Sequence, residues 1–150
     1  MLTFRPITAD DRAVVIPMVQ AFYQTDAVEH PVDPAILERS FLALTDPQEP
    51  LLWGYLILEK DKPAGYVYLT QCYSAEVGGR CLFIEELFLT PECRGRGLGR
   101  QVMDWLDWEY PQAQRLRLEV TRDNKSAIRL YQKAGYRHLS YDQMVLDRED

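Results

Sequence analysis

Residues 94–100 read Arg-Gly-Arg-Gly-Leu-Gly-Arg, and these residue types at this spacing suit a phosphate ligand. Glycine lets a backbone turn tightly and approach a ligand closely, because it has no Cβ. A helix that begins directly after such a turn directs free N–H groups and the positive end of its dipole at the turn. Arginine adds positive charge and fork-shaped donors. The run therefore predicts a pyrophosphate-binding loop between a strand and a helix, formed by Arg94, Gly95, Arg96, Gly97, Leu98, Gly99 and Arg100.

Two established phosphate motifs do not account for this run. The P-loop requires a Gly-Lys-Ser/Thr ending, which is absent here. The dinucleotide-binding motif requires a different spacing from the one set by Gly95, Gly97 and Gly99. What remains is Arg94-x-x-Gly97-x-Gly99, a pattern that is also compatible with a solvated Arg/Gly turn. The elements on either side of the loop must decide between the two interpretations.

The overall charge of the chain is opposite to the charge of this loop. The formal net charge is −6. An acidic chain is a poor candidate for nucleic-acid binding, which relies on neutralising phosphates, so we expect no nucleic-acid partner. A basic loop on an acidic protein indicates a local anionic ligand instead.

The composition predicts one folded domain over residues 1–150. The chain is 47% apolar and 27% charged, which is ordinary for a globular domain of this length. No apolar run approaches the length that spans a bilayer, and residues 1–6 lack the layout of a signal peptide. We therefore expect no membrane partner and a cytoplasmic location. Three cysteines without CxxC spacing (Cys72, Cys81 and Cys93) predict reduced, buried thiols, and two separated histidines predict no metal site.

Hydrophobic spacing predicts the elements that position the loop. Alternating apolar residues favour strands, and apolar residues at helical spacing favour helices. We expect strands at 2–7, 51–59, 64–73, 81–89, 115–121, 136–141 and 143–146, and helices at 8–23, 34–44, 98–110 and 126–134.

The order of these elements predicts the fold class. The three strands between 51 and 89 are joined by short turns, which favour an antiparallel meander. The strand, helix and strand around the glycine loop favour a parallel pair, 81–89 with 115–121. We therefore predict an α/β (α+β) fold with a mixed, mostly antiparallel central sheet of about six to seven strands, flanked by about four helices.

These elements and motifs together resemble the GNAT superfamily of N-acetyltransferases. Residues 83–91 look like the fourth strand of that family, and Arg94-x-x-Gly97-x-Gly99 is similar to its (Arg/Gln)-x-x-Gly-x-(Gly/Ala) pyrophosphate loop. Residues 124–136 are similar to its last motif, which ends in Tyr-x-x-x-Gly-Phe/Tyr. The resemblance covers the whole chain in outline and is most specific over 83–136. The adjacent Glu85 and Glu86 resemble the polyamine and diamine branch of the superfamily in particular.

The resemblance implies acetyl-CoA as the cofactor and assigns residues to hold it. The loop would bind the pyrophosphate, and main-chain groups of Leu87, Phe88 and Leu89 would pair with the pantetheine arm as an added strand. That pairing requires the parallel strands to splay apart, commonly at a bulge. Asn124, with Ala127 on the same helix, would contact the cofactor arm, although Asn124 also suits a simple helix cap.

The resemblance also implies two catalytic residues. A lysine-like amine has a pKa of about 10.4, so it is mostly protonated at neutral pH. A carboxylate can take the proton directly or through a water, and the family match favours Glu85. Because adjacent strand residues face opposite sides, we expect only one of the two glutamates to point at the acceptor and Glu86 to form a surface ion pair. Tyr131 would protonate the leaving thiolate, although it also suits a core position. A backbone N–H near Leu87 or Phe88 would polarise the carbonyl.

The acceptor is marked by an acidic, aromatic stretch. Asp26, Glu29 and Asp33 lie where family members place their acceptor loop, and aromatic residues such as Tyr23 could wall a pocket there. Together with Glu85, such an acidic, aromatic pocket suits a small cationic amine. A solvated acidic loop remains open, as does a protein or peptide acceptor. A non-catalytic acyl-CoA-binding module is a third possibility. The family resemblance makes a homodimer possible, although no stretch of this sequence indicates an interface.

Overall fold

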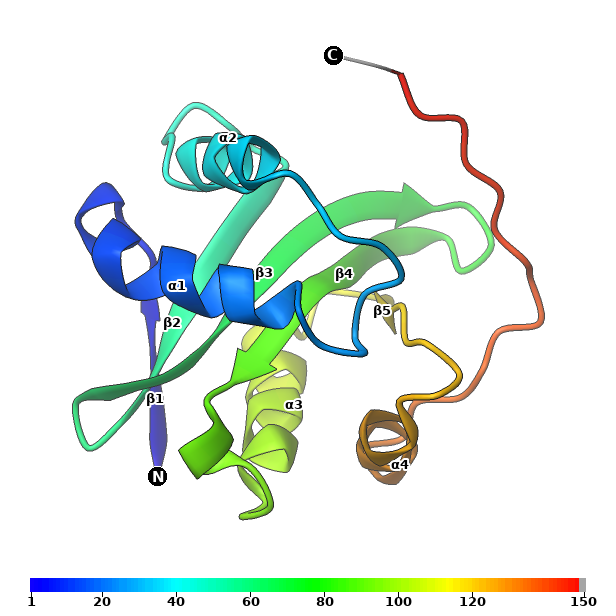
Figure 1. Cartoon of the computed structure of the whole chain (residues 1–150). Coiled ribbons are helices and arrows are strands. Elements are labelled where there is room, and N and C mark those ends of the chain that lie inside the picture. The colour runs from blue at the N-terminus through cyan, green and yellow to red at the C-terminus, as the bar shows by residue number, and fades with distance from the viewer. Residues whose placement is uncertain (149–150) are drawn as a thin grey trace.

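Five strands form one sheet, in the order β1-β2-β3-β4-β5. The computed structural model describes residues 1–148 (Figure 1). The strands are β1 (Leu2–Pro6), β2 (Leu52–Glu59), β3 (Lys62–Ser74), β4 (Gly79–Leu89) and β5 (Arg115–Leu118), and the helices are α1 (Arg12–Phe22), α2 (Pro34–Leu44), α3 (Leu98–Glu109) and α4 (Lys125–Lys133). Neighbouring strands from β1 to β4 pair antiparallel, and β4 pairs with β5 in parallel. The predicted mixed fold and its parallel pair are confirmed.

The predicted strand count is wrong, because the described residues hold five strands and not six to seven. No strand forms over 136–141 or 143–146, the two segments that alternate in sequence. Alternation produces a strand only where one face can be buried. Here four of the apolar side chains stay in solvent: Tyr141, Met144, Val145 and Leu146 are 66%, 97%, 84% and 78% exposed.

Helices cover both faces of the sheet and divide the core in two. On one face, α1 and α2 pack on Leu56, Tyr66 and Phe88. On the other face, α3 packs on residues such as Val67 and Ile84. Figure 1 shows α1 and α2 on the side of the sheet opposite α3. No helix within residues 1–148 is long and apolar enough to cross a membrane.

A bulge in β4 marks the position where the sheet opens. Tyr68 pairs with Glu86 and Leu69 pairs with Ile84, so Glu85 is an extra residue without a partner on β3. The ladder between β4 and β5 ends one residue earlier, at the pair Ile84 and Leu118. A bulge bends its strand and increases the local twist. The two parallel strands therefore separate where Glu85 stands, which confirms the predicted splay.

Candidate active site

The second half of β4 has one free edge. Residues 86–89 pair with β3 on one side, while the described part of β5 pairs only with residues 81–84. Main-chain N–H and C=O groups on such an edge need partners, and an extended chain that carries amides can supply them. The side chains alternate as in an ordinary strand, since Phe88 is buried beneath α1 while Leu87 and Leu89 pack toward α3. The predicted role of Leu87, Phe88 and Leu89 thus rests on their backbone.

The loop that follows β4 is shaped by its glycines. Gly95 has φ 71° and Gly97 has φ 76°, in the left-handed region that other residues rarely adopt. Gly97 is the N-cap of α3, so the first N–H groups of that helix, from Leu98 onward, point toward the loop. Gly99 has a different role, because a Cβ there would lie 2.8 Å from Leu130 Cδ2 of α4. The loop therefore has the geometry of an anion site, and Gly99 holds α4 close to it.

Two arginines of the loop contact other parts of the protein. The Arg94 Nε donates to the carbonyl oxygen of Leu89 at 2.9 Å, and its guanidinium lies 5.3 Å from the centre of the Phe88 ring. The two η nitrogens of Arg96 donate to the carboxylate of Glu59 at 3.0 and 2.7 Å. These contacts tie the loop to β4 and to the end of β2.

The third arginine of the run 94–100 lies in the first turn of α3 and also has protein partners. Arg100 donates to Asp104 at 2.9 Å and to the carbonyl oxygen of Lys133 at 3.0 Å. All three guanidiniums thus have protein partners. The sequence predicted all three arginines in the loop, but Arg100 lies in the first turn of α3. The structure ties all three to other protein groups and leaves the main chain of 95–98 as the candidate anion-binding surface.

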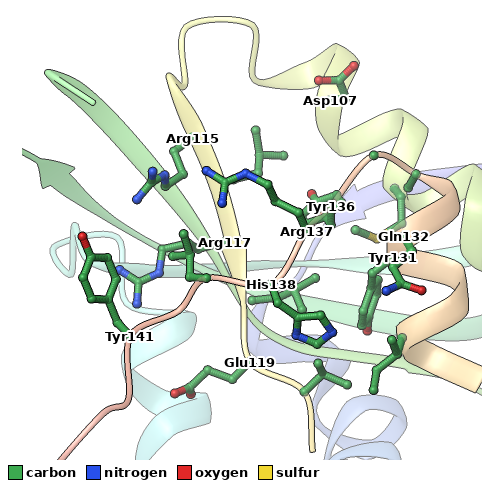
Figure 2. Close-up of a pocket in the computed structure, with 18 of the residues that line it drawn as sticks. Asp107, Arg115, Arg117, Glu119, Tyr131, Gln132, Tyr136, Arg137, His138 and Tyr141 are labelled. Atoms are coloured by element: carbon green, nitrogen blue, oxygen red, sulfur yellow. The ribbon is translucent and has the colours of Figure 1, made fainter. Parts of the chain in front are cut away.

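The residues predicted on α4 occupy its first two turns. The Asn124 Oδ1 accepts a hydrogen bond from the N–H of Ala127 at 3.4 Å, so Asn124 caps the helix. Tyr131 lines a cavity of about 760 Å³ between β5, α3, α4 and residues 136–143. Figure 2 shows Tyr131 on the α4 side of this cavity and Glu119 on the β5 side. Burial raises the pKa of Tyr131, which keeps its hydroxyl protonated.

Glu85 stands at the bulge with part of its side chain exposed. Its Oε1 accepts a hydrogen bond from the Thr70 hydroxyl at 3.0 Å. Burial raises the pKa of Glu85, the Thr70 hydrogen bond opposes that rise, and the nearby charge of Glu119 adds to it. A carboxylate whose pKa is raised is a better proton acceptor.

Glu86 has a more enclosed environment. Its Oε2 accepts from the Tyr23 hydroxyl at 2.6 Å and its Oε1 accepts from the Tyr66 hydroxyl at 2.8 Å. Burial raises the pKa of Glu86, although both hydrogen bonds oppose the rise. The expectation of a surface ion pair for Glu86 is therefore wrong, because the buried Tyr66 and the half-buried Tyr23 hold it.

The expectation that the two glutamates face opposite sides is also wrong. Tyr66 and Thr70 lie on the same face of β3, because strand residues alternate with a period of two. Glu86 contacts Tyr66 and Glu85 contacts Thr70, so both carboxylates lie on the α1 and α2 face. The bulge removes the alternation at this one position.

The predicted acceptor residues are only partly brought together. Tyr23, at the end of α1, joins the site through Glu86. The carbonyl oxygen of Asp26 accepts from the Thr121 hydroxyl at 2.7 Å, which ties the loop after α1 to the chain just beyond β5. Glu29 lies 3.8 Å from His30 with its side chain 84% exposed, so it points into solvent.

Thr70 and Thr121 make hydrogen bonds that the sequence did not predict. The predicted strands 64–73 and 81–89 form a hairpin, and pairing them would have placed Thr70 near the glutamates. No local pattern indicates Thr121, whose partner lies 95 residues away in the sequence.

The mixed sheet and its flanking helices form a GNAT fold, and comparison with known proteins agrees. The model of the acetyltransferase (GNAT) family matches residues 16–136, so this chain belongs to that family. A search of curated protein sequences gives no match.

Solved structures share the fold over nearly the whole chain. A possible acetyltransferase from Clostridium difficile 630 has a TM-score of 0.81 at 17% identity, covering 100% of this chain and 99% of that one. A ribosomal-protein-alanine N-acetyltransferase from Brucella melitensis biovar Abortus 2308 has a TM-score of 0.76 at 15% identity, covering 99% and 100%. A predicted acetyltransferase with acetyl-CoA from Clostridium acetobutylicum has a TM-score of 0.75 at 16% identity, covering 97% and 96%.

Proposed function

We propose that this protein is an acetyl-CoA-dependent N-acetyltransferase whose acceptor is a small cationic amine. The observation that carries the proposal is the coincidence of three features at one position of β4. The bulge, the end of the ladder with β5 and the Glu85 carboxylate all fall between Ile84 and Glu86. The Glu85 carboxylate, which can accept a proton, thus lies at the start of a free main-chain edge. This position suits the place where acetyl-CoA and the amine would meet.

The residues present fit acetyl-CoA, which when bound supplies the acetyl thioester. The free edge of Leu87–Leu89 would pair with the amides of the pantetheine arm. The N–H groups of residues 95–98, at the N-terminus of α3, would hold the pyrophosphate. The Asn124 Oδ1 already caps α4, so contact with the cofactor would come from its side-chain NH₂ group.

Glu85 is the better proton acceptor of the two glutamates. Each oxygen of Glu86 already accepts a hydrogen bond from a tyrosine, whereas Glu85 has only Thr70 on one oxygen among the described hydrogen bonds. Glu85 is also the more exposed of the two. We therefore propose that Glu85 accepts the proton of the amine and that Glu86 holds Tyr23 and Tyr66 in place. Tyr131, which stays protonated, would donate a proton to the leaving thiolate.

Charge and access favour a small cation as the acceptor. Two carboxylates and the ring of Tyr23 lie on one face at the splay, and such a set attracts an ammonium group. The contact between Thr121 and Asp26 draws the loop after α1 toward β5, which narrows access from this side. A protein or peptide amine, as the name of the Brucella neighbour states for that protein, is the second candidate.

An acceptor screen tests this proposal. Purified protein is incubated with acetyl-CoA and either small amines and diamines or peptides with free N-termini and lysines, and free thiol release is measured. Turnover with small amines is expected. Turnover with peptides alone would show that the acceptor is a protein or peptide amine instead. CoA binding by calorimetry without turnover in either panel would favour a non-catalytic acyl-CoA-binding module.

A further inference from the structure

Two of the three cysteines face each other across the hairpin of β3 and β4. Cys72 and Cys81 are direct partners in the antiparallel register. Such partners have side chains on the same face, with Cα atoms about 4.5 or about 5.5 Å apart depending on the pair type. Both spacings fall within the range of about 4.4–6.8 Å that disulfides require. The strands can therefore accept an S–S bond while keeping their register.

The two thiols differ in access to solvent. Cys72 is exposed, which corrects the expectation that all three cysteines are buried, and Cys81 is 0% exposed. Burial raises the pKa of Cys81, and the facing Cys72 thiol adds to that rise. An oxidant in solution therefore meets Cys72 first, with Cys81 already in place behind it.

The strand on the other side of Cys81 adds positive charge. Cys81 pairs with Arg115 of β5, and Arg117 lies two residues further along that strand. Both guanidinium groups act on the Cys81 thiol in the direction that favours the thiolate, against the larger effect of burial. Nearby arginines promote the thiolate form that attacks an oxidised sulfur.

We propose that Cys72 and Cys81 form a peroxide-oxidisable dithiol that closes to a reversible intrachain disulfide. Hydrogen peroxide converts the Cys72 thiol to a sulfenic acid and releases one water. The Cys81 sulfur then attacks the Cys72 sulfur, the S–O bond breaks, and a second water leaves as the disulfide forms. Two thiols lose two electrons in total, and one peroxide is reduced to two waters. This property is independent of the acceptor amine.

The third cysteine supplies a matched control. Cys93 is also a free thiol, but it is 7% exposed and lies in the core cluster beneath α3, away from the hairpin pair. Replacing Cys93 by serine should leave the oxidation unchanged. Cys72→Ser removes an exposed thiol, so the variant should fold and should be unable to form the bond.

The test treats the full chain with hydrogen peroxide and then alkylates the remaining thiols under denaturing conditions. We expect one alkylated cysteine instead of three, a chain lighter by two hydrogen atoms before alkylation, and a peptide that links residues 72 and 81. Reduction with dithiothreitol should restore three reactive thiols. The same result is expected for Cys93→Ser, with its one fewer thiol.

Three outcomes would overturn the proposal. These are three thiols that remain reactive after treatment, a Cys72 that proceeds to sulfinic acid without a link to Cys81, and a disulfide between two chains through Cys72. A circular dichroism spectrum of Cys72→Ser that matches the native protein ensures that its lack of a disulfide is not a folding defect.

Discussion

Main-chain groups dominate the donor side of the site, where acetyl-CoA is proposed to bind. Side chains from three elements form the acceptor side, where the amine is proposed to bind. The donor side runs along residues 87–89 of β4 and through 95–98 at the start of α3, in one short stretch of chain. The acceptor side brings Tyr23 at the end of α1 and Thr70 on β3 to the two glutamates of β4. A backbone site tolerates most side-chain changes and is sensitive to glycine replacement. A side-chain site fails when a single functional group is removed.

The largest effect is expected on the acceptor side, from Glu85→Gln. The amide cannot take the proton of the amine, so kcat/KM should fall by about a thousandfold, while the Kd of CoA should stay unchanged. Steady-state thiol release and calorimetry measure the two quantities.

The matched control for this change is Glu29→Gln. It removes an equal charge from the same side of the molecule, at a side chain that is 84% exposed. Its kcat/KM should stay near that of the native protein. Equal losses of kcat/KM in the two variants would show that the overall negative charge, and not proton transfer to Glu85, is what the reaction requires.

The next largest effect is expected from Tyr131→Phe. Losing the hydroxyl removes the proposed proton donor, and kcat should fall by about a hundredfold, because water can partly replace it. Tyr136→Phe is the control, since its ring lies 6.2 Å from that of Tyr131 and its buried hydroxyl has no hydrogen-bond partner in the described structure. A kcat for Tyr131→Phe that equals the native value with every active acceptor would remove Tyr131 from the mechanism.

A smaller effect is expected on the donor side, from Gly97→Ala. An alanine at φ 76° is strained by about 1–2 kcal/mol. Distortion of the loop should weaken CoA binding by about tenfold, as measured by calorimetry.

Gly78→Ala separates loop distortion from general strain. Gly78 has φ 69°, lies in the turn between β3 and β4 and, like Gly97, has open space around the position of a Cβ. Both variants should lose similar stability, and only Gly97→Ala should bind CoA more weakly. If Gly78→Ala weakens CoA binding as much, the loop main chain is not the anion site.

The difference between the two sides also explains what the sequence could predict. The donor side depends on neighbouring residues, so the run 94–100 and the strand and helix around it predicted the loop and the start of α3 at Leu98. The acceptor side depends on contacts between distant residues. Tyr23 and Glu86 are 63 residues apart, and no local pattern pairs them.

Two structural predictions failed for reasons that lie outside any local pattern. Alternation placed Glu85 and Glu86 on opposite faces, and one extra residue in β4 brought them to the same face. Alternation also predicted strands over 136–146, where Tyr136 packs on the core but Tyr141, Met144, Val145 and Leu146 stay exposed. Side-chain hydrogen bonds such as Gln143 to Glu119 hold this part of the chain. Both errors come from assuming that a two-residue alternation always gives a regular strand whose successive side chains point to opposite faces.

The smallest effect is expected from Glu86→Gln, which tests whether Glu86 is buried as a structural part of the acceptor side. Burial raises the folded-state pKa of Glu86 above its ordinary value of 4.5. The stability that the protonated group contributes is therefore complete below 4.5 and is lost as the pH rises through the folded-state pKa. The glutamine variant does not titrate there, so the melting temperature of the native protein should fall relative to the variant as the pH rises from about 4 to about 8. A constant difference over that range would show that Glu86 ionises as freely as a surface carboxylate, and that the tyrosines do not enclose it.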